Sequence, residues 1–220
     1  MEKAILSRRI VSVLADISRL TNVLYALNTM DIQQYPDNYE ALSTDAALRA
    51  EWIACRLRHL VYATTQTPKD EYLLLATVMQ GIEIRSEDGL VEITLPGLMP
   101  KRKQKSNKEY LLDPFAAALS QYARENPMPR LNHCVICFSQ VYCRELPMRR
   151  IRDYDNLELK QFLDVAASFI MTDDNGLLCD AYHTTELGED DCTRITIMDS
   201  RLFPDWLDKR QTTLQSIRDL

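Results

Sequence analysis

The order of the periodic segments predicts an α+β fold, a mixed sheet with helices that an N-terminal helical hairpin precedes. Three observations lead to this class. Apolar residues recur every three or four positions through most of the first 80 residues. Short β-rich runs then alternate with two helical runs, and a last helical run closes the chain. We expect a helical extension over residues 1–80, an α+β domain over 81–200 and a C-terminal helix over 201–220.

Length and composition are those of an ordinary soluble protein. The chain has 220 residues, 46% of them hydrophobic, which is enough to bury a core. No uninterrupted apolar run reaches the roughly 20 residues that span a bilayer, and the N-terminus lacks the pattern of a signal peptide. The six cysteines lie mostly inside apolar runs, as buried thiols in a reducing compartment do. We expect a cytoplasmic protein with no membrane contact and no organic cofactor.

The first 80 residues predict helices at about 4–27, 44–62 and 67–81. Tyr35-Pro36-Asp37-Asn38 separates the first two, which can form an antiparallel hairpin. Thr67 and Pro68 begin the third helix and Gly81 ends it. No polar groups cluster here, so this region is interpreted as an interaction or dimerisation module.

The following region predicts a sheet. Two β-rich runs at 82–85 and 90–95 flank an Asp-Gly turn and indicate a hairpin. A helix from Pro114 to about 125 and a strand at 133–142 come next, then strands at 177–185 and 192–198 around an acidic turn at 186–191. In the 133–142 strand, Cys134 and Cys137 would face opposite sides, which argues against a shared zinc ion. A last helix is expected over 203–220.

Between these strands lies an acidic segment, residues 149–174, in which a function can be argued. Asp153 and Asp155 are two apart, and in an extended backbone their carboxylates face the same side. A helix should begin at about Asp155 or Asn156 and end near residue 168. The chain that returns from this helix would bring Asp173 and Asp174 back beside the first pair.

Carboxylates gathered from two segments need a cation, since like charges raise each other's pKa. Mg²⁺, or Mn²⁺ in its place, prefers such oxygen ligands and often binds substrate phosphate as well. The alternative from pattern alone is that Asp155 caps the helix, Lys160 pairs with Asp164 on the surface, and residues 173–176 form only a turn.

Two basic clusters precede the aspartates along the chain. The first comprises Lys101, Arg102, Lys103 and Lys105, and the second, which comprises Arg149, Arg150 and Arg152, comes immediately before Asp153. The formal net charge is -6, so the chain is no general polyanion binder. Local cationic clusters beside a metal site are nevertheless what a phosphodiesterase needs to position a DNA backbone. The alternative is that both are solvated loops.

The acidic segment resembles the RusA family of Holliday-junction resolvases over about residues 93–198. That family has an Asp-x-Asp-Asn motif, a Lys about one turn into the next helix, a Leu-Asp or Phe-Asp, and a paired Asp-Asp before a strand. The corresponding residues here are Asp153-Tyr154-Asp155-Asn156, Lys160, Leu163-Asp164 and Asp173-Asp174. The lysine is one place late, because the family position holds Leu159. Either the helix begins later here, or the lysine has another role.

The resemblance implies a Mg²⁺-dependent endodeoxyribonuclease that acts as a homodimer on branched DNA, in DNA recombination or DNA repair. Asp153, Asp155 and Asp174 would hold the metal with Asp173 as a helper, and Lys160 would assist catalysis. The whole chain also resembles an uncharacterised group of bacterial mobile-element proteins. Two alternatives remain open: a catalytically inactive DNA-binding or regulatory protein of a mobile element, and a helical protein-interaction scaffold.

Overall fold

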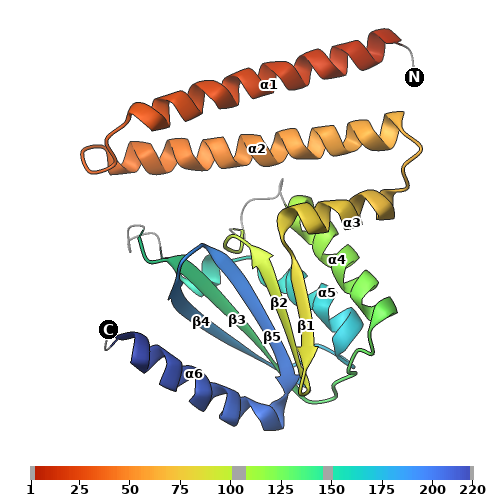
Figure 1. The fold of residues 1–220 in the computed structure, drawn as a ribbon, viewed down its shortest axis with the longest axis vertical. Helices are drawn as coiled ribbons and strands as arrows, with labels where there is room; N and C mark the ends of the chain where they lie inside the picture. Colours follow the sequence, from red (N-terminus) through yellow and green to blue (C-terminus); the bar gives the residue numbers. More distant parts are fainter. Residues whose placement is uncertain (1–2, 101–107, 146–150, 219–220) are drawn as a thin grey trace. The chain divides into compact units, whose positions relative to one another are not determined.

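The computed structural model describes residues 3–100, 108–145 and 151–218 (Figure 1). The chain divides into two compact units. The first comprises residues 1–72 and 104–111, and the second comprises residues 73–103 and 112–220.

The first unit is built on a helical hairpin, as predicted. Helix α1 (Lys3–Thr29) packs against α2 (Pro36–Thr64) through buried residues such as Val13 and Ile53. Between the two helices, the Arg56 guanidinium binds the Asp16 carboxylate. Helix α2 begins at Pro36 and not at about 44. Proline is tolerated at the first helical position, because the backbone N–H that it lacks would have no hydrogen-bond partner within the helix.

By length and composition alone, helix α1 is long and apolar enough to cross a membrane. Its apolar residues do not form a continuous run, because Asp16 and Arg19 interrupt them. A signal sequence or the core helix of a soluble protein can have the same length and composition. Several apolar side chains of α1 are exposed, among them Leu14 at 55% and Leu24 at 50%.

The second unit contains the predicted hairpin. Helix α3 (Lys69–Gln80) ends at Gly81, whose φ is +69°. Strands β1 (Glu83–Glu87) and β2 (Leu90–Pro96) then pair antiparallel around Asp88 and Gly89. Both turn residues have positive φ, 51° and 79°, as a two-residue hairpin turn requires.

Five strands form one mixed sheet in the order β1-β2-β5-β3-β4, which confirms the α+β class. Strand β3 (Cys134–Cys143) runs parallel to β4 (Cys179–Gly188) and antiparallel to β5 (Cys192–Asp199). Parallel neighbours need a crossover connection, and this one carries the acidic segment and helix α5 (Lys160–Ile170). The fold therefore places the predicted site in the β3–β4 crossover.

Helix α4 (Lys108–Glu125) begins before the predicted start, so Pro114 lies inside it. Proline leaves the carbonyl four residues earlier without its helical donor. That carbonyl belongs to Tyr110, and the Arg58 guanidinium donates to it at 3.4 Å. The sequence alone does not reveal this distant donor, which explains the misplaced start.

Two layers of helices sandwich the sheet. Helices α4 and α5 cover one face (Figure 1). On β3, Ile136 and Phe138 point to this face, where Phe115 and Phe162 pack with ring centroids 5.5 Å apart. Val135 points to the other face. There, the short 3-10 turn at Ser200–Leu202 leads into α6 (Phe203–Arg218), which packs on Tyr182 and Met198. The last helix was predicted.

Candidate functional site

The first aspartate pair lies on a short 3-10 turn, Tyr154–Asn156, and not at the start of a long helix. Helix α5 begins only at Lys160. The predicted start at Asp155 or Asn156 is wrong because Leu157 is extended (φ -93°, ψ 146°) and buried. The backbone N–H of Glu158 also donates to the Pro100 carbonyl at 2.9 Å. This non-local bond holds the segment out of the helix.

A ring stack anchors the turn on strand β4. The Tyr154 ring stacks on His183 at 5.4 Å, and His183 stacks on Phe138 at 5.8 Å. The Tyr154 hydroxyl shares a hydrogen bond with the Thr185 hydroxyl at 2.8 Å. Burial lowers the pKa of His183, so its imidazole is neutral near pH 7. The sequence analysis missed His183, because only the tertiary fold places it under Tyr154.

The second aspartate pair lies in an exposed turn before β4. Met171 ends helix α5, and the N–H of Thr172 donates to the Leu131 carbonyl at 2.8 Å. The Asp173 carboxylate then accepts a hydrogen bond from the Asn175 N–H at 3.2 Å. Interaction with Asn175 lowers the pKa of Asp173. The local structure around Asp173 and Asp174 is thus the turn that the sequence analysis gave as the alternative to a metal site.

Lys160 connects the two halves of the acidic segment. Its ammonium contacts both oxygens of Asp164, at 2.9 and 3.1 Å, on an exposed helix face. The pKa of Lys160 is raised first by Asp164, and to a lesser degree by Asp174 and Glu158. Asp164 is thus the main partner of Lys160, and Asp174 contributes only a minor part of its raised pKa.

The carboxylates are not gathered into a metal centre. Among the described residues, no three His, Cys, Asp or Glu side chains form a group that can hold a metal ion. Tyr154 contacts β4 at His183, four residues beyond Cys179, or about 13 Å along a strand. Asp174, by contrast, acts electrostatically on Cys179 itself. The donor chemistry fits a hard divalent cation, but Tyr154, beside the first pair, packs on His183 in the middle of β4, whereas the second pair precedes the start of β4.

The basic clusters are described only in part. Arg152 is half-buried, and its N–H donates to the Tyr142 hydroxyl at 3.1 Å. The other predicted phosphate contacts lie outside the described residues, namely Lys101, Arg102, Lys103, Lys105, Arg149 and Arg150.

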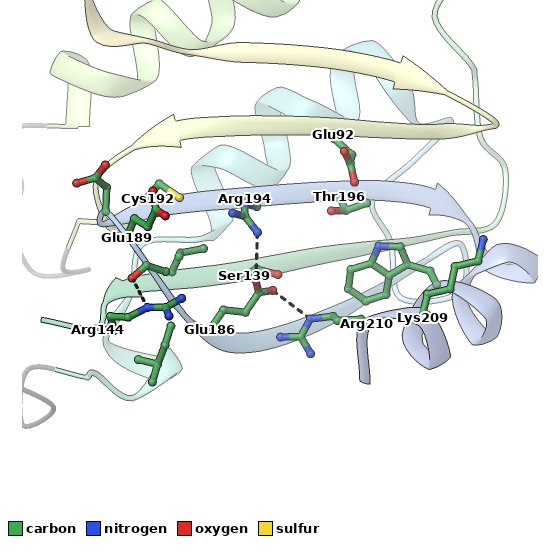
Figure 2. Close-up of a pocket in the computed structure, with 15 residues that line it drawn as sticks. Glu92, Ser139, Arg144, Glu186, Glu189, Cys192, Arg194, Thr196, Lys209 and Arg210 are labelled. Carbon is green, nitrogen blue, oxygen red and sulfur yellow. Dashed lines mark hydrogen bonds and ion pairs between the residues drawn. The ribbon is translucent and has the colours of Figure 1, made fainter. Parts of the chain in front are cut away.

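A separate cleft of about 640 Å³ lies on the face of the sheet that carries α6 (Figure 2). Its centre is an ionic chain in which Glu186 accepts from Arg194 at 3.2 Å and from Arg210 at 3.1 Å. Arg210 also donates to the Thr184 hydroxyl. The lining residues are Glu92, Ser139, Val141, Arg144, Glu186, Leu187, Gly188, Glu189, Asp190, Cys192, Arg194, Thr196, Trp206, Lys209 and Arg210. One carboxylate thus pairs with two guanidinium groups, and these ion pairs hold the centre of the cleft together.

The sequence analysis missed this cleft because it placed Glu186 in a turn, whereas β4 extends to Gly188. Polar residues at alternating positions along the strands could have predicted this polar face of the sheet. On β5, Arg194 and Thr196 are two apart and face the same side. Ser139 on β3 and Glu92 on β2 continue this polar face across the sheet (Figure 2).

Comparison with known proteins identifies the family. A model of the "Family of unknown function (DUF6100)" matches residues 2–220. The chain belongs to this family. No curated protein matches it. One solved structure that it resembles is the periplasmic domain of Helicobacter pylori MotB (residues 90–256), at 10% identity and a TM-score of 0.33 over 62% of this chain and 89% of that chain. A likeness at that level carries no functional argument.

In this DUF6100 member, the ion pair between Glu186 and Arg210 connects α6 to strand β4. Glu186→Ala should lower the free energy of unfolding by about 2 kcal/mol, because it removes hydrogen bonds between charged groups that include the mostly buried Arg210. Urea denaturation measures the loss. The matched control is Glu189→Ala, an exposed carboxylate on the same cleft. Equal losses in the two variants would contradict the role given to Glu186.

Proposed function

We propose that the β3–β4 crossover is the catalytic segment of a RusA-like, Mg²⁺-dependent endodeoxyribonuclease for branched DNA. The observation that carries the proposal is the topology of this crossover: both exposed aspartate pairs lie in it, one on each side of helix α5, before β4 pairs parallel to β3. Helix α5 is 11 residues long, about 16 Å, so a chain continuing beyond it would leave Asp174 far from Lys160. The return of the chain is what the RusA-like motif requires.

Each acidic residue has a proposed role. Asp153, Asp155 and Asp174 would hold Mg²⁺, or Mn²⁺ in its place, and Asp173 would assist from the same turn. The four side chains are exposed, so solvent and substrate reach them. When bound, the ion lowers the pKa of a coordinated water and stabilises charge on the phosphate. The active form would be a cytoplasmic homodimer, as in the resembled family.

Lys160 stands one position later than the lysine of the family pattern, and its surroundings define two roles. Its main partner is Asp164, which leaves the ammonium on the exposed face. Its weaker interaction with Asp174 keeps it within reach of the proposed metal ligands. We propose that Lys160 exchanges Asp164 for the scissile phosphate when DNA binds.

The second candidate is a catalytically inactive DNA-binding or regulatory protein. The observation that favours it is that the described residues gather no three metal-ligating side chains. The exposed apolar side chains of α1 favour a third candidate, a helical interaction scaffold.

One experiment separates the three candidates. A synthetic four-way junction and a linear duplex of the same sequence are incubated with the protein in Mg²⁺, in Mn²⁺ and in chelator. The nuclease binds the junction in every condition and cuts it only in Mg²⁺ or Mn²⁺. The inactive binder retains junction affinity in every condition and cuts nothing. The scaffold neither binds nor cuts.

The basic cluster at 101–105 predicts a salt-dependent DNA affinity. Replacing Lys101, Arg102 and Lys103 together by Ala should weaken junction binding and flatten its dependence on salt. Each lost duplex phosphate contact should reduce the log–log slope by about 0.9. Fluorescence anisotropy at several salt concentrations measures this slope. An unaltered slope would make the loop a solvated surface, and metal affinity should stay the same throughout.

A further inference from the structure

Two cysteines occupy the first paired position of the parallel β3–β4 ladder. Cys134 begins β3, Cys179 begins β4, and the two are register partners. Neighbouring strands lie about 4.8 Å apart and register partners point to the same face. That separation falls within the roughly 4.4–6.8 Å range between Cα atoms in disulfides. Both thiols are free, so the backbone supplies the spacing of a disulfide without the bond.

The two thiols differ in environment. Cys134 is 1% exposed, and its pKa is raised, first by its interaction with Cys179 and then by burial. The Cys134 thiol donates to the Leu178 carbonyl at 3.7 Å, and the pKa of Cys179 is lowered, first by its interaction with Cys134. Cys179 is half-buried and follows an exposed turn in which Leu177 is 89% exposed. Cys179 is therefore the thiol that a soluble oxidant reaches and that ionises first.

In strand register, Cys137 and Cys192 face residues other than cysteine. Cys137 pairs in register with Tyr182 and Thr196, and burial raises the pKa of its thiol to about 12. Cys192 pairs with Pro96 and Val141, and burial raises the pKa of its thiol as well. The pairing of cysteine with cysteine is thus specific to the start of β3 and β4 among the described strands.

We propose that Cys134 and Cys179 form a peroxide-sensitive thiol pair that closes to an intramolecular disulfide. The Cys179 thiolate sulfur attacks one oxygen of the peroxide, the O–O bond breaks, and hydroxide leaves, giving a sulfenic acid. The Cys134 sulfur then attacks the Cys179 sulfur, the S–S bond forms and the S–O bond breaks. The departing hydroxide takes the Cys134 proton. Two thiols supply two electrons to one hydrogen peroxide, which becomes two waters.

This site is independent of the nuclease proposal, because it requires neither metal nor DNA. It nevertheless adjoins the turn that carries Asp173 and Asp174, since the field of Asp174 reaches Cys179. The disulfide would fix the start of β4 to the start of β3. Oxidation would thereby restrain the strand that follows this turn.

The test uses the reduced full-length chain with an equimolar amount of hydrogen peroxide. Remaining thiols are alkylated after unfolding, and peptides are fragmented in a mass spectrometer. The expected result is the loss of two alkylation sites and a Cys134–Cys179 cross-link that dithiothreitol reverses. Cys179→Ser should abolish the cross-link. The matched control, Cys192→Ser, replaces another half-buried strand cysteine and should retain it.

Two results would overturn the proposal. One is a Cys179 sulfinic acid beside a Cys134 that is still fully alkylated. The other is a disulfide that joins any other pair of cysteines. Since both results are read from the unsubstituted chain, the test holds even if a variant fails to fold.

Discussion

Asp155→Asn should abolish most cleavage of a four-way junction while leaving junction binding in chelator unchanged. The substitution keeps the size of the side chain but removes the charge that would bind the metal ion. Removing one preorganised catalytic group typically costs about 100- to 1000-fold in rate. We expect a loss of at least this size under single-turnover conditions in saturating Mg²⁺.

The matched control for this substitution is Asp180→Asn. Asp180 is also an exposed carboxylate of the β3–β4 region, but it lies on β4 and outside the proposed ligands. Its rate should stay close to that of the unsubstituted chain. If both variants lose the same activity, a general electrostatic effect replaces the metal-ligand role of Asp155.

Phe162→Ala should lower the free energy of unfolding of the second unit by about 3–5 kcal/mol. The Phe162 ring is fully buried and packs on Phe115, so its removal leaves a cavity between α5 and α4. Because α5 carries Lys160 and is followed by the second aspartate pair, the same cavity loosens the crossover that holds the proposed site.

Urea denaturation followed by tryptophan fluorescence measures this loss. The chain has two tryptophans, and Trp52 belongs to the first unit. A Trp52→Phe background leaves Trp206 to report on the second unit. Phe169→Ala, on the same helix but only half-buried, is the control and should cost clearly less. Equal costs would mean that α5 is not anchored through Phe162.

Features that depend on nearby residues were predicted from the sequence. The Asp88–Gly89 turn determines its own conformation through two residues with positive φ. The amphipathic stripe of α5 was also predicted, since Phe162, Ala166 and Ile170 keep the helical period. In both cases, residues close together in the sequence determine the local structure.

Features that depend on distant contacts were not predicted. The start of α5 depends on a hydrogen bond from Glu158 to Pro100, and the start of α4 involves Arg58. His183 became part of the site only because Tyr154 stacks on it. The separation of the two aspartate pairs likewise follows from the tertiary fold, which packs Tyr154 on His183 but leaves the second pair before β4, and residue spacing alone does not determine it.

The proposed function depends on a metal ion that the four aspartates bind, so a metal titration is its most direct test. Isothermal calorimetry with Mn²⁺, and competition by Mg²⁺, should give one saturable site per chain. Asp155→Asn and Asp174→Asn should each abolish it, and Asp180→Asn should retain it. Saturable binding that survives in both Asp155→Asn and Asp174→Asn, or no saturable binding in the unsubstituted chain, would contradict the account.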